Sequence, residues 1–335
     1  MLTPYLGRIS AGENLTMEEM AAVMAEVMAG RCRENEIALL LTALKAKGET
    51  ADEIAGAALV MRQNMTPIRS TRQGIVDTCG TGGVGSNIFN VSTAAAIVTA
   101  AAGVPVAKHG NRSATSKSGS ADVLQSLGVN IAAPVETVER CLEELGLCFC
   151  FAPSLHPAMK HVAAVRKQLG TATIFNLLGP LCNPARASYQ VLGVGKPELQ
   201  GMMAEVLLRL GTERAVVVGG DGMGEVTVTG PTEVREVTPS GIRTFTWQAA
   251  DFGLSFAGKE SLVVDGPQAS AAIIRDVLAG QQGPPRDMVL INAAAALWVA
   301  GFAASPRDCA LRAAEAIDTR AAQGLLAELA RESNR

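Results

Sequence analysis

The spacing of apolar residues changes near residue 70, and this change limits the possible folds more than any other feature of the chain. Over residues 1–65, apolar side chains recur at the three- and four-residue intervals of amphipathic helices. From about residue 71, short apolar runs alternate with helical stretches rich in alanine. Such alternation is typical of a mostly parallel sheet with helices on both faces. The sequence therefore predicts a small all-helical part followed by a large α/β part.

Capping motifs and glycines mark the ends of three predicted helices in the first part. Thr16-Met-Glu-Glu19 has the pattern of a capping box, and an apolar stripe follows it as far as Gly30. A second stripe covers residues 37–44, and a second capping box, Thr50-Ala-Asp-Glu53, begins the third helix. Three short helices bury too little apolar surface to be stable alone. We therefore expect them to pack on other chain segments or on a second subunit.

Five apolar runs in the second part have the length and composition of buried strands. They are Ile75–Thr78, Val104–Ala107, Leu147–Ala152, Gln190–Val194 and Ala215–Gly219. Residues 217–237 resemble further short strands separated by Gly-Asp and Gly-Pro turns. Helices are predicted at Ser92–Ala102, Ala121–Leu127 and Asp287–Ala300.

The glycine-rich segment CGTGGVGSNIFN, residues 79–90, directly follows the first predicted strand. Glycine at this density lets backbone amides approach a phosphate closely. Three of its glycines fit the G-x-G-x-x-G pattern, but a dinucleotide site also needs an acidic residue after the next strand. That strand ends instead in KHGNR, residues 108–112. A nucleotide P-loop is excluded too, because Ser86-Asn87 stands where it requires lysine and a hydroxyl residue.

The second predicted strand leads into a turn made of cations and hydroxyl groups. Residues 108–120, KHGNRSATSKSGS, contain two lysines, one arginine and five serine or threonine residues, and no acid. In the preceding turn, Asn90-Val-Ser-Thr93 places side-chain oxygens and free N–H groups at the start of a helix. Two adjacent strand-to-helix turns with this chemistry indicate a ligand that carries two phosphate groups.

Composition argues against several other classes of protein. A net charge of −3 and only 4% aromatic residues disfavour a nucleic-acid-binding protein, which needs a basic face and stacking side chains. No run approaches the ~20 apolar residues of a membrane span, and the amino terminus lacks the pattern of a secretory signal. We therefore expect a cytoplasmic protein without membrane contact. The seven cysteines are scattered without a C-x-x-C pair, which favours reduced thiols over zinc or disulfide roles.

Long segments of the chain resemble anthranilate phosphoribosyltransferases, enzymes of tryptophan biosynthesis, and the resemblance covers nearly the whole length. They are DTCGTGG with FNVSTAAA, VAKHGNRSATSKSGSADVLQSLGV, FAPSLHPAMKHVAAVRKQLGTATIFNLLGPLCNP and RDMVLINAAAAL. The resemblance implies a helical domain of residues 1–70, completed by about 163–186, joined by a hinge to an α/β domain of residues 71–162 and 187–335. It also implies a homodimer through the N-terminal helices, and transfer of phosphoribose from phosphoribosyl diphosphate to the amine of anthranilate with Mg²⁺.

The resemblance also implies roles for individual residues. The phosphoribosyl diphosphate site would consist of Gly80, Gly82, Gly83, Asn90, Ser92, Thr93, Lys108, Asn111, Arg112, Ser113, Ser116 and Ser120. The anthranilate site would consist of Gly80, His109, Asn111 and Arg166, and the metal ligands would be Ser92 and Glu225. No general base is assigned, because an aromatic amine is already nucleophilic and positioning supplies most of the catalysis.

Three positions in the expected site depart from the family pattern. Val84 replaces an acid in the glycine loop, Ile88 replaces a threonine that would bind diphosphate, and Gly224 replaces one of two metal-binding acids. Asp221 is a candidate replacement ligand, with a plain turn residue as the alternative. Mg²⁺ binds through a few carboxylates together with phosphates and water, so we expect weaker metal binding rather than none.

These departures leave other functions open. One is a paralogue with a changed acceptor or without catalysis, although the intact acceptor residues favour an active enzyme. TGGVG also resembles the phosphate loop of pyrimidine nucleoside phosphorylases, but KHGNRS and the Arg166 segment match the anthranilate enzymes. A nucleic-acid-binding relative would use the cationic turn on backbone phosphates.

Overall fold

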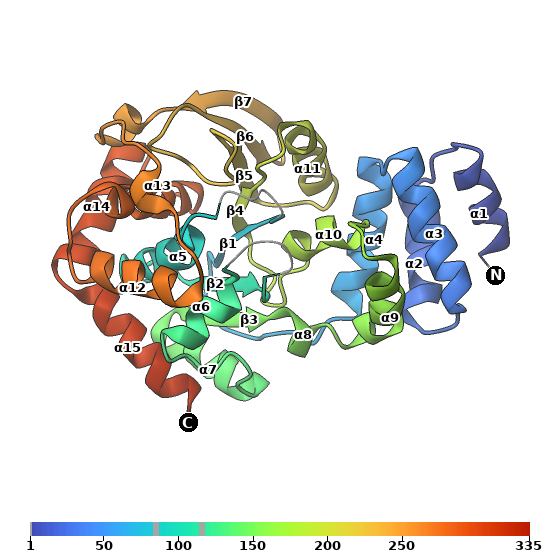
Figure 1. Ribbon diagram of the computed structural model, residues 1–335, viewed down its shortest axis with the longest axis horizontal. Helices are drawn as coiled ribbons and strands as arrows, with labels where there is room; N and C mark the ends of the chain where they lie inside the picture. Colours follow the sequence, from blue (N-terminus) through green and yellow to red (C-terminus); the bar gives the residue numbers. More distant parts are fainter. Residues whose placement is uncertain (1, 83–86, 114–117) are drawn as a thin grey trace.

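The computed structural model describes residues 2–82, 87–113 and 118–335, and these form two parts, a helical part and a sheet part (Figure 1). The helical part begins with α1 (Thr3–Ser10), α2 (Met17–Met28), α3 (Glu34–Lys47) and α4 (Ala51–Gln63). Capping boxes at Thr16 and Thr50 begin α2 and α4, as the sequence predicts. Helix α1 was not predicted, because it buries only Ile9 and so has no repeating apolar stripe.

The helical part shares its apolar core with segments from later in the chain. Helices α9 (Lys160–Leu169) and α10 (Phe175–Leu178) pack on α2, α3 and α4. The same core continues through α11 (Pro197–Arg209), which contacts α4. The expectation that the short N-terminal helices pack on other chain segments is thus confirmed.

The described residues of the sheet part form a seven-stranded sheet of order β3-β2-β1-β4-β5-β6-β7. Its strands are β1 (Val76–Gly80), β2 (Val106–Gly110), β3 (Leu147–Phe151), β4 (Tyr189–Gly193), β5 (Arg214–Gly219), β6 (Thr232–Thr238) and β7 (Gly241–Trp247). The first five are the five predicted strands, and they run parallel. Strands β6 and β7 add an antiparallel edge. The expectation of several short strands over residues 217–237 was wrong between the end of β5 at Gly219 and the start of β6 at Thr232. In that stretch Gly220 and Met223 form only an isolated bridge.

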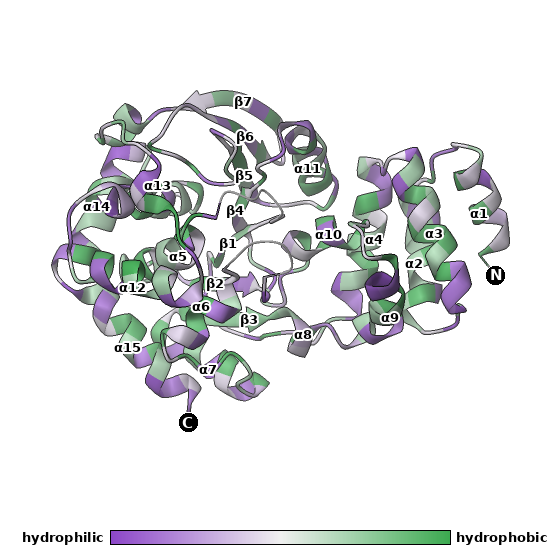
Figure 2. Ribbon diagram, in the orientation of Figure 1, coloured by the Kyte–Doolittle hydropathy of each residue, from purple (hydrophilic) through white to green (hydrophobic). Residues whose placement is uncertain are grey.

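Helices cover the sheet and carry most of the remaining core. They are α5 (Val91–Ala101), α6 (Ser120–Ser126), α7 (Val135–Leu145), α8 (Ala152–Leu155), α12 (Pro267–Leu278), α13 (Pro284–Val299), α14 (Pro306–Asp318) and α15 (Ala321–Ser333). Helix α13 is buried along most of its length and packs on α5 and α14. In Figure 2, α5 and α13 carry mostly hydrophobic colour, whereas the outer helix α15 alternates between the two colours. Both helices contain a run of alanines, Ala94–Ala96 in α5 and Ala293–Ala296 in α13, and such small side chains let backbones approach each other closely.

The chain crosses between the two parts through three segments, residues 64–75, 152–159 and 182–188. The first and the last of these crossovers touch, because the Ile68 N–H donates to the Pro184 carbonyl at 3.0 Å. The first crossover is also fixed to α8, where the Thr66 N–H donates to the Leu155 carbonyl at 2.8 Å. In the part of the chain that the structure describes, no helix has the length and apolar character needed to cross a membrane.

Candidate active site

The first glycine-rich turn leaves the carboxyl end of β1 and is shaped by close backbone contacts. A Cβ atom added at Gly80 would lie 2.9 Å from the Gly193 carbonyl oxygen on β4, so no side chain fits there. Gly82 has a φ of +66°, in the left-handed region that favours glycine. The turn ends at Asn90, whose side-chain oxygen caps α5 by accepting from the Thr93 N–H at 3.1 Å. A bare backbone thus faces the amino terminus of a helix, an arrangement suited to anions.

Lys108 connects this turn to the second strand. Its side chain is buried, and the ammonium donates to the Ser92 hydroxyl at 3.1 Å and to the Thr78 carbonyl. Burial lowers the pKa of Lys108, and the negative charge of Asp77 opposes this effect. The predicted phosphate-binding residues Ser92 and Lys108, which lie 16 positions apart in sequence, are therefore in direct contact.

The second turn follows β2 and is closed by its own hydrogen bonds. The Asn111 carbonyl accepts from the Ser120 hydroxyl at 3.4 Å, and so joins the start of the turn to the first residue of α6. Arg112, predicted to bind phosphate, forms an ion pair with Asp122 at 2.7 Å and donates to Gln125 at 3.0 Å. The Ser113 N–H donates to the same Asp122 carboxylate at 3.1 Å. Arg112 can contact phosphate only by sharing or leaving these partners.

A pair of buried histidines lies beside the two turns. His109 Nδ1 is 2.9 Å from the Gly179 carbonyl oxygen, and its Nε2 is 3.1 Å from Nε2 of His156. Since a carbonyl can only accept, His109 carries its proton on Nδ1 and accepts from His156 at Nε2. Burial lowers the pKa of His109 to about 3 and that of His156 to about 4. Both rings are therefore neutral at physiological pH.

Arg166, the predicted anthranilate-binding arginine, lies on α9 and contacts Phe175 of α10. Its guanidinium is half-buried and lies over the Phe175 ring, 5.3 Å from the ring centre. Burial lowers the pKa of Arg166, and no described residue forms an ion pair with it. An uncompensated guanidinium stacked on an aromatic ring is suited to receive a carboxylate.

Glu225 is the one predicted metal ligand with a free buried oxygen. Its Oε2 is buried and has no hydrogen-bond partner among the described residues. Burial raises the pKa of Glu225 to about 7, while the Gly224 backbone and the charge of Lys108 oppose this shift. Asn292 of α13 holds the loop in place, because it accepts from the Val226 N–H at 3.0 Å and donates to the Val226 carbonyl at 2.7 Å.

Asp221, the candidate replacement metal ligand, already binds two other side chains. Its carboxylate forms an ion pair with Lys259 at 2.7 Å and accepts from the Thr229 hydroxyl at 2.5 Å. Both partners lower the pKa of Asp221, and its φ of +52° places it at a tight turn. These contacts favour the plain turn residue over the replacement metal ligand. No group of three or more His, Cys, Asp or Glu side chains suited to a metal occurs within the described ranges.

Of the departures from the family pattern, Ile88 is fixed by a neighbouring loop. It forms an isolated bridge with Val263, and the flanking Phe89 N–H donates to the Leu262 carbonyl at 2.8 Å. The backbone of Gly224 lies close against the end of β4, since a Cβ at Gly193 would lie 1.8 Å from the Gly224 carbonyl oxygen. Gly83, Val84 and Ser116 lie outside the described residues.

Two residues of this region were missed as site residues by sequence reasoning. His156 stood within a segment that matched the family, but nothing in the local pattern placed it against His109. Asp77 is fully buried in β1 and accepts from the His109 N–H at 3.0 Å. A buried acid within an apolar strand was the available signal for Asp77.

Comparison with known proteins covers the whole chain. Residues 72–323 match the family model "Glycosyl transferase family, a/b domain", and residues 3–65 match "Glycosyl transferase family, helical bundle domain". Anthranilate phosphoribosyltransferase of Anaeromyxobacter sp. (strain K) is 51% identical over 329 residues, 98% of each chain. That of Geotalea uraniireducens is 47% identical over the full length of both chains.

Solved structures agree with these matches. The crystal structure of anthranilate phosphoribosyltransferase from Thermus thermophilus superposes with a TM-score of 0.92 at 43% identity, covering 98% of this chain and 99% of that one. The enzyme from Saccharomyces cerevisiae in complex with PRPP and Mg gives a TM-score of 0.90 at 27% identity, covering 99% and 98%. With two matching domain models and this degree of identity over its whole length, the chain belongs to the anthranilate phosphoribosyltransferase family.

Proposed function

We propose that the protein transfers phosphoribose from 5-phosphoribosyl 1-diphosphate to the amine of anthranilate and releases diphosphate. The observation that carries this proposal is the contact between the first turn and the strand that leads into the second, where the buried Lys108 ammonium of β2 donates to Ser92 at the start of α5. It supports one binding site for one ligand with two phosphate groups, rather than two separate anion sites. The relatives that match nearly the full chain bear the name of this activity.

The turns would stabilise the departing diphosphate. As the bond to the ribose carbon breaks, negative charge grows on the leaving group while positive charge develops on the sugar. The amino terminus of α5 and the Lys108 ammonium offer fixed positive charge to that leaving group. Because these groups are held by the fold before substrate binds, little reorganisation is needed at the moment of reaction.

Mg²⁺ fits the residues present as a cation shared between protein and substrate. The unpartnered Glu225 Oε2 would supply one carboxylate ligand, and the Ser92 hydroxyl would supply a neutral one. Mg²⁺ is usually held by one or two carboxylates together with substrate phosphates and water. When bound, it would neutralise diphosphate charge in addition to what Lys108 provides.

Arg166 and the histidine pair would position the acceptor. The guanidinium of Arg166 would bind the carboxylate of anthranilate, leaving the ring to lie against Phe175 and the neighbouring segment. His109 and His156 are neutral and hydrogen-bonded to each other, so neither carries a charge that would repel the sugar cation. The amine attacks as the neutral nucleophile while the bond to diphosphate breaks, and after the new C–N bond has formed its surplus proton would pass to water or to the released diphosphate.

A direct assay tests the proposal. Anthranilate, phosphoribosyl diphosphate, Mg²⁺ and protein are mixed, and the loss of anthranilate fluorescence is followed over a range of metal concentrations. We expect turnover that requires both substrates. Absence of turnover at every Mg²⁺ concentration would reject the proposal, and phosphate-dependent release of base from thymidine or uridine would instead favour a nucleoside phosphorylase.

We also propose a homodimer formed through the N-terminal helices. Leu39 on α3 is 50% exposed, which is unusual for a large apolar side chain of a helix that otherwise buries its leucines. Light scattering at micromolar concentration should give twice the mass of the chain, and Leu39→Glu should reduce it to that of a monomer.

A further inference from the structure

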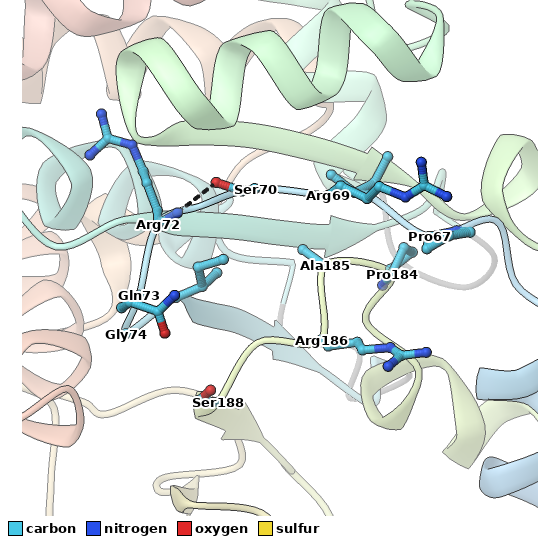
Figure 3. Close-up of a pocket in the computed structure, with 12 residues that line it drawn as sticks. Pro67, Arg69, Ser70, Arg72, Gln73, Gly74, Pro184, Ala185, Arg186 and Ser188 are labelled. Atoms are coloured by element: carbon cyan, nitrogen blue, oxygen red, sulfur yellow. Dashed lines mark hydrogen bonds between the residues drawn. The ribbon is translucent and has the colours of Figure 1, made fainter.

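A cavity of about 530 Å³ lies where the first crossover, residues 64–75, meets the last, residues 182–188, away from the candidate active site. It is lined by residues of both crossovers, namely Pro67, Ile68, Arg69, Ser70, Arg72, Gln73, Gly74, Ile75, Pro184, Ala185, Arg186 and Ser188 (Figure 3). Gly74 and Ser188 lie just before β1 and β4, so the cavity opens at the amino ends of the parallel strands. The candidate active site lies at their carboxyl ends.

The lining is cationic and carries no acidic residue. Three of the twelve lining residues are arginines, and none is aspartate or glutamate. In Figure 3, Arg69 from one crossover and Arg186 from the other point to the same side of the cavity, with Pro184 between them in this view. Arg72 lies at the opposite end, where it donates to the carbonyls of Glu143 and Glu144 at 2.9 and 3.2 Å.

The guanidinium groups of Arg69 and Arg186 have no acceptor among the described residues. The nearby carboxylates of Glu139 and Glu143 are used to fix the backbone of the crossover. Glu139 accepts from the Arg69 N–H at 2.8 Å, and Glu143 accepts from the Thr71 N–H at 2.9 Å. Neither acid forms an ion pair with a guanidinium of the cavity within the described ranges.

A further cation lies behind Arg186. Arg62 at the end of α4 is half-buried and donates through Nε to the Leu181 carbonyl at 2.7 Å. Burial lowers the pKa of Arg62, and the positive charge of Arg186 lowers it further. Like charges so close together disfavour one another until an anion lies between them or beside them.

We infer that this cavity is a second binding site, and that its ligand is a small polyanion such as an organic phosphate or a polycarboxylate. Paired guanidinium groups recognise the oxygens of either class through charge-assisted hydrogen bonds. The cavity volume is within the range of small-molecule sites, and Pro67, Ile68 and Pro184 provide an apolar wall for a carbon skeleton. A bound anion would join the first crossover to the last through Arg69 and Arg186.

Calorimetric titration in EDTA, with pyrophosphate and citrate as probes, tests this inference. Wild-type protein should bind pyrophosphate at the cavity in addition to the candidate active site, and should bind citrate at the cavity. Arg69→Gln with Arg186→Gln should lose the cavity binding, with affinity falling about tenfold or more per guanidinium removed. Arg186→Lys should recover part of it. A preference for pyrophosphate identifies the phosphate class, and a preference for citrate the carboxylate class.

A matched variant controls for net charge. Arg33→Gln with Arg331→Gln removes the same two charges from exposed positions and should bind both probes as wild type does. Equal isotherms for the cavity variant and wild type, or no citrate or second pyrophosphate binding at all, would overturn the inference. The inference stands apart from the proposed function, because loss of transferase activity would leave the binding that depends on Arg69 and Arg186 unchanged.

Discussion

Arg166 combines partial burial, an aromatic neighbour and the absence of an ion partner among the described residues. Replacing it by alanine removes one charge-assisted contact to a carboxylate, which is worth roughly 1.5–3 kcal/mol. We expect Arg166→Ala to raise the KM for anthranilate by about 10- to 100-fold and to change kcat little. Steady-state kinetics measure both, and the exposed neighbour Lys167→Ala serves as the control with unchanged KM.

The buried histidine pair makes the stability of the protein depend on pH. The folded pKa values, about 3 for His109 and about 4 for His156, lie below the unfolded value of 6.5. As pH falls below 6.5, these two histidines therefore become protonated in the unfolded chain but stay neutral in the folded chain, and the free energy of unfolding decreases. Well above pH 6.5 they are neutral in both states, and this loss of stability is absent. We expect the two histidines to reduce the free energy of unfolding by roughly 2.5 kcal/mol between pH 7 and 5.5.

Urea denaturation at the two pH values measures this loss. His156→Gln should halve the difference between them, whatever it does to stability at pH 7, because one of the two protons is removed. A pH dependence identical to that of wild type would contradict the neutral, coupled pair.

Gly224 offers a test of the metal site. A Cβ there would lie 3.3 Å from the Gly193 carbonyl carbon and from the Gly195 nitrogen, so a side chain needs a backbone shift of a few tenths of an ångström. Gly224→Asp adds a second carboxylate beside Glu225, and we expect it to lower the Mg²⁺ concentration needed for half-maximal transfer several-fold. Calorimetric titration with Mn²⁺ provides a readout independent of activity. Gly224→Asn has the same shape without charge and should leave both measurements near wild type.

Among the helices, Glu53 of α4 connects the segment before α2, the end of α3 and the start of α4. Its carboxylate accepts from the Leu15 N–H at 3.0 Å, the Thr50 N–H at 2.9 Å and the Lys47 ammonium at 2.9 Å. Both members of the ion pair are buried. Glu53→Gln leaves the Lys47 charge without its partner and should lower the free energy of unfolding by about 3–5 kcal/mol. Urea denaturation checks this value, and Glu13→Gln, in an exposed pair with Arg8, should cost less than about 1 kcal/mol.

Helices with explicit local signals could be predicted, and elements without them could not. The capping boxes at Thr16 and Thr50 fixed two helix starts, because both partners of each box lie within four residues. The five parallel strands appeared as apolar runs of ordinary strand length. Strand β6 pairs with β5 and β7, whereas β7 pairs with β6 at the edge of the sheet and is mostly exposed, so its apolar pattern is weaker.

In the candidate site, too, residues with local sequence signals could be predicted, whereas contacts between residues far apart in sequence could not. Gly80, Asn90 and Lys108 could be placed from motifs, because glycine turns and helix caps act within a few residues. The contact of His109 with His156 joins residues 47 positions apart, and the ion pair of Asp221 with Lys259 joins residues 38 apart. Such contacts depend on how the elements pack, which a single sequence does not specify.

At the scale of the whole molecule, the shared core predicts one unfolding transition. The helical part shares its core with Leu192 of β4, with Val194 just after that strand and with α11, and Arg209 of α11 forms an ion pair with Asp52 of α4 at 2.6 Å. Trp247 and Trp298 lie together in the sheet part, so tryptophan fluorescence reports only that part, whereas far-UV circular dichroism reports all helices. We expect the two signals to change at the same urea concentration. A circular dichroism transition at lower urea would show that the helical part unfolds separately.

The contact between Ile68 and Pro184 constrains how the two parts can move relative to each other. A third connection, residues 152–159, runs from the carboxyl end of β3 to α9, and the Thr66 N–H is bonded to it at the Leu155 carbonyl. The first connection is thus bonded to both of the others. Three mutually attached connections hold the helical part against the sheet more firmly than a single linker would, and they join it near both ends of the parallel strands.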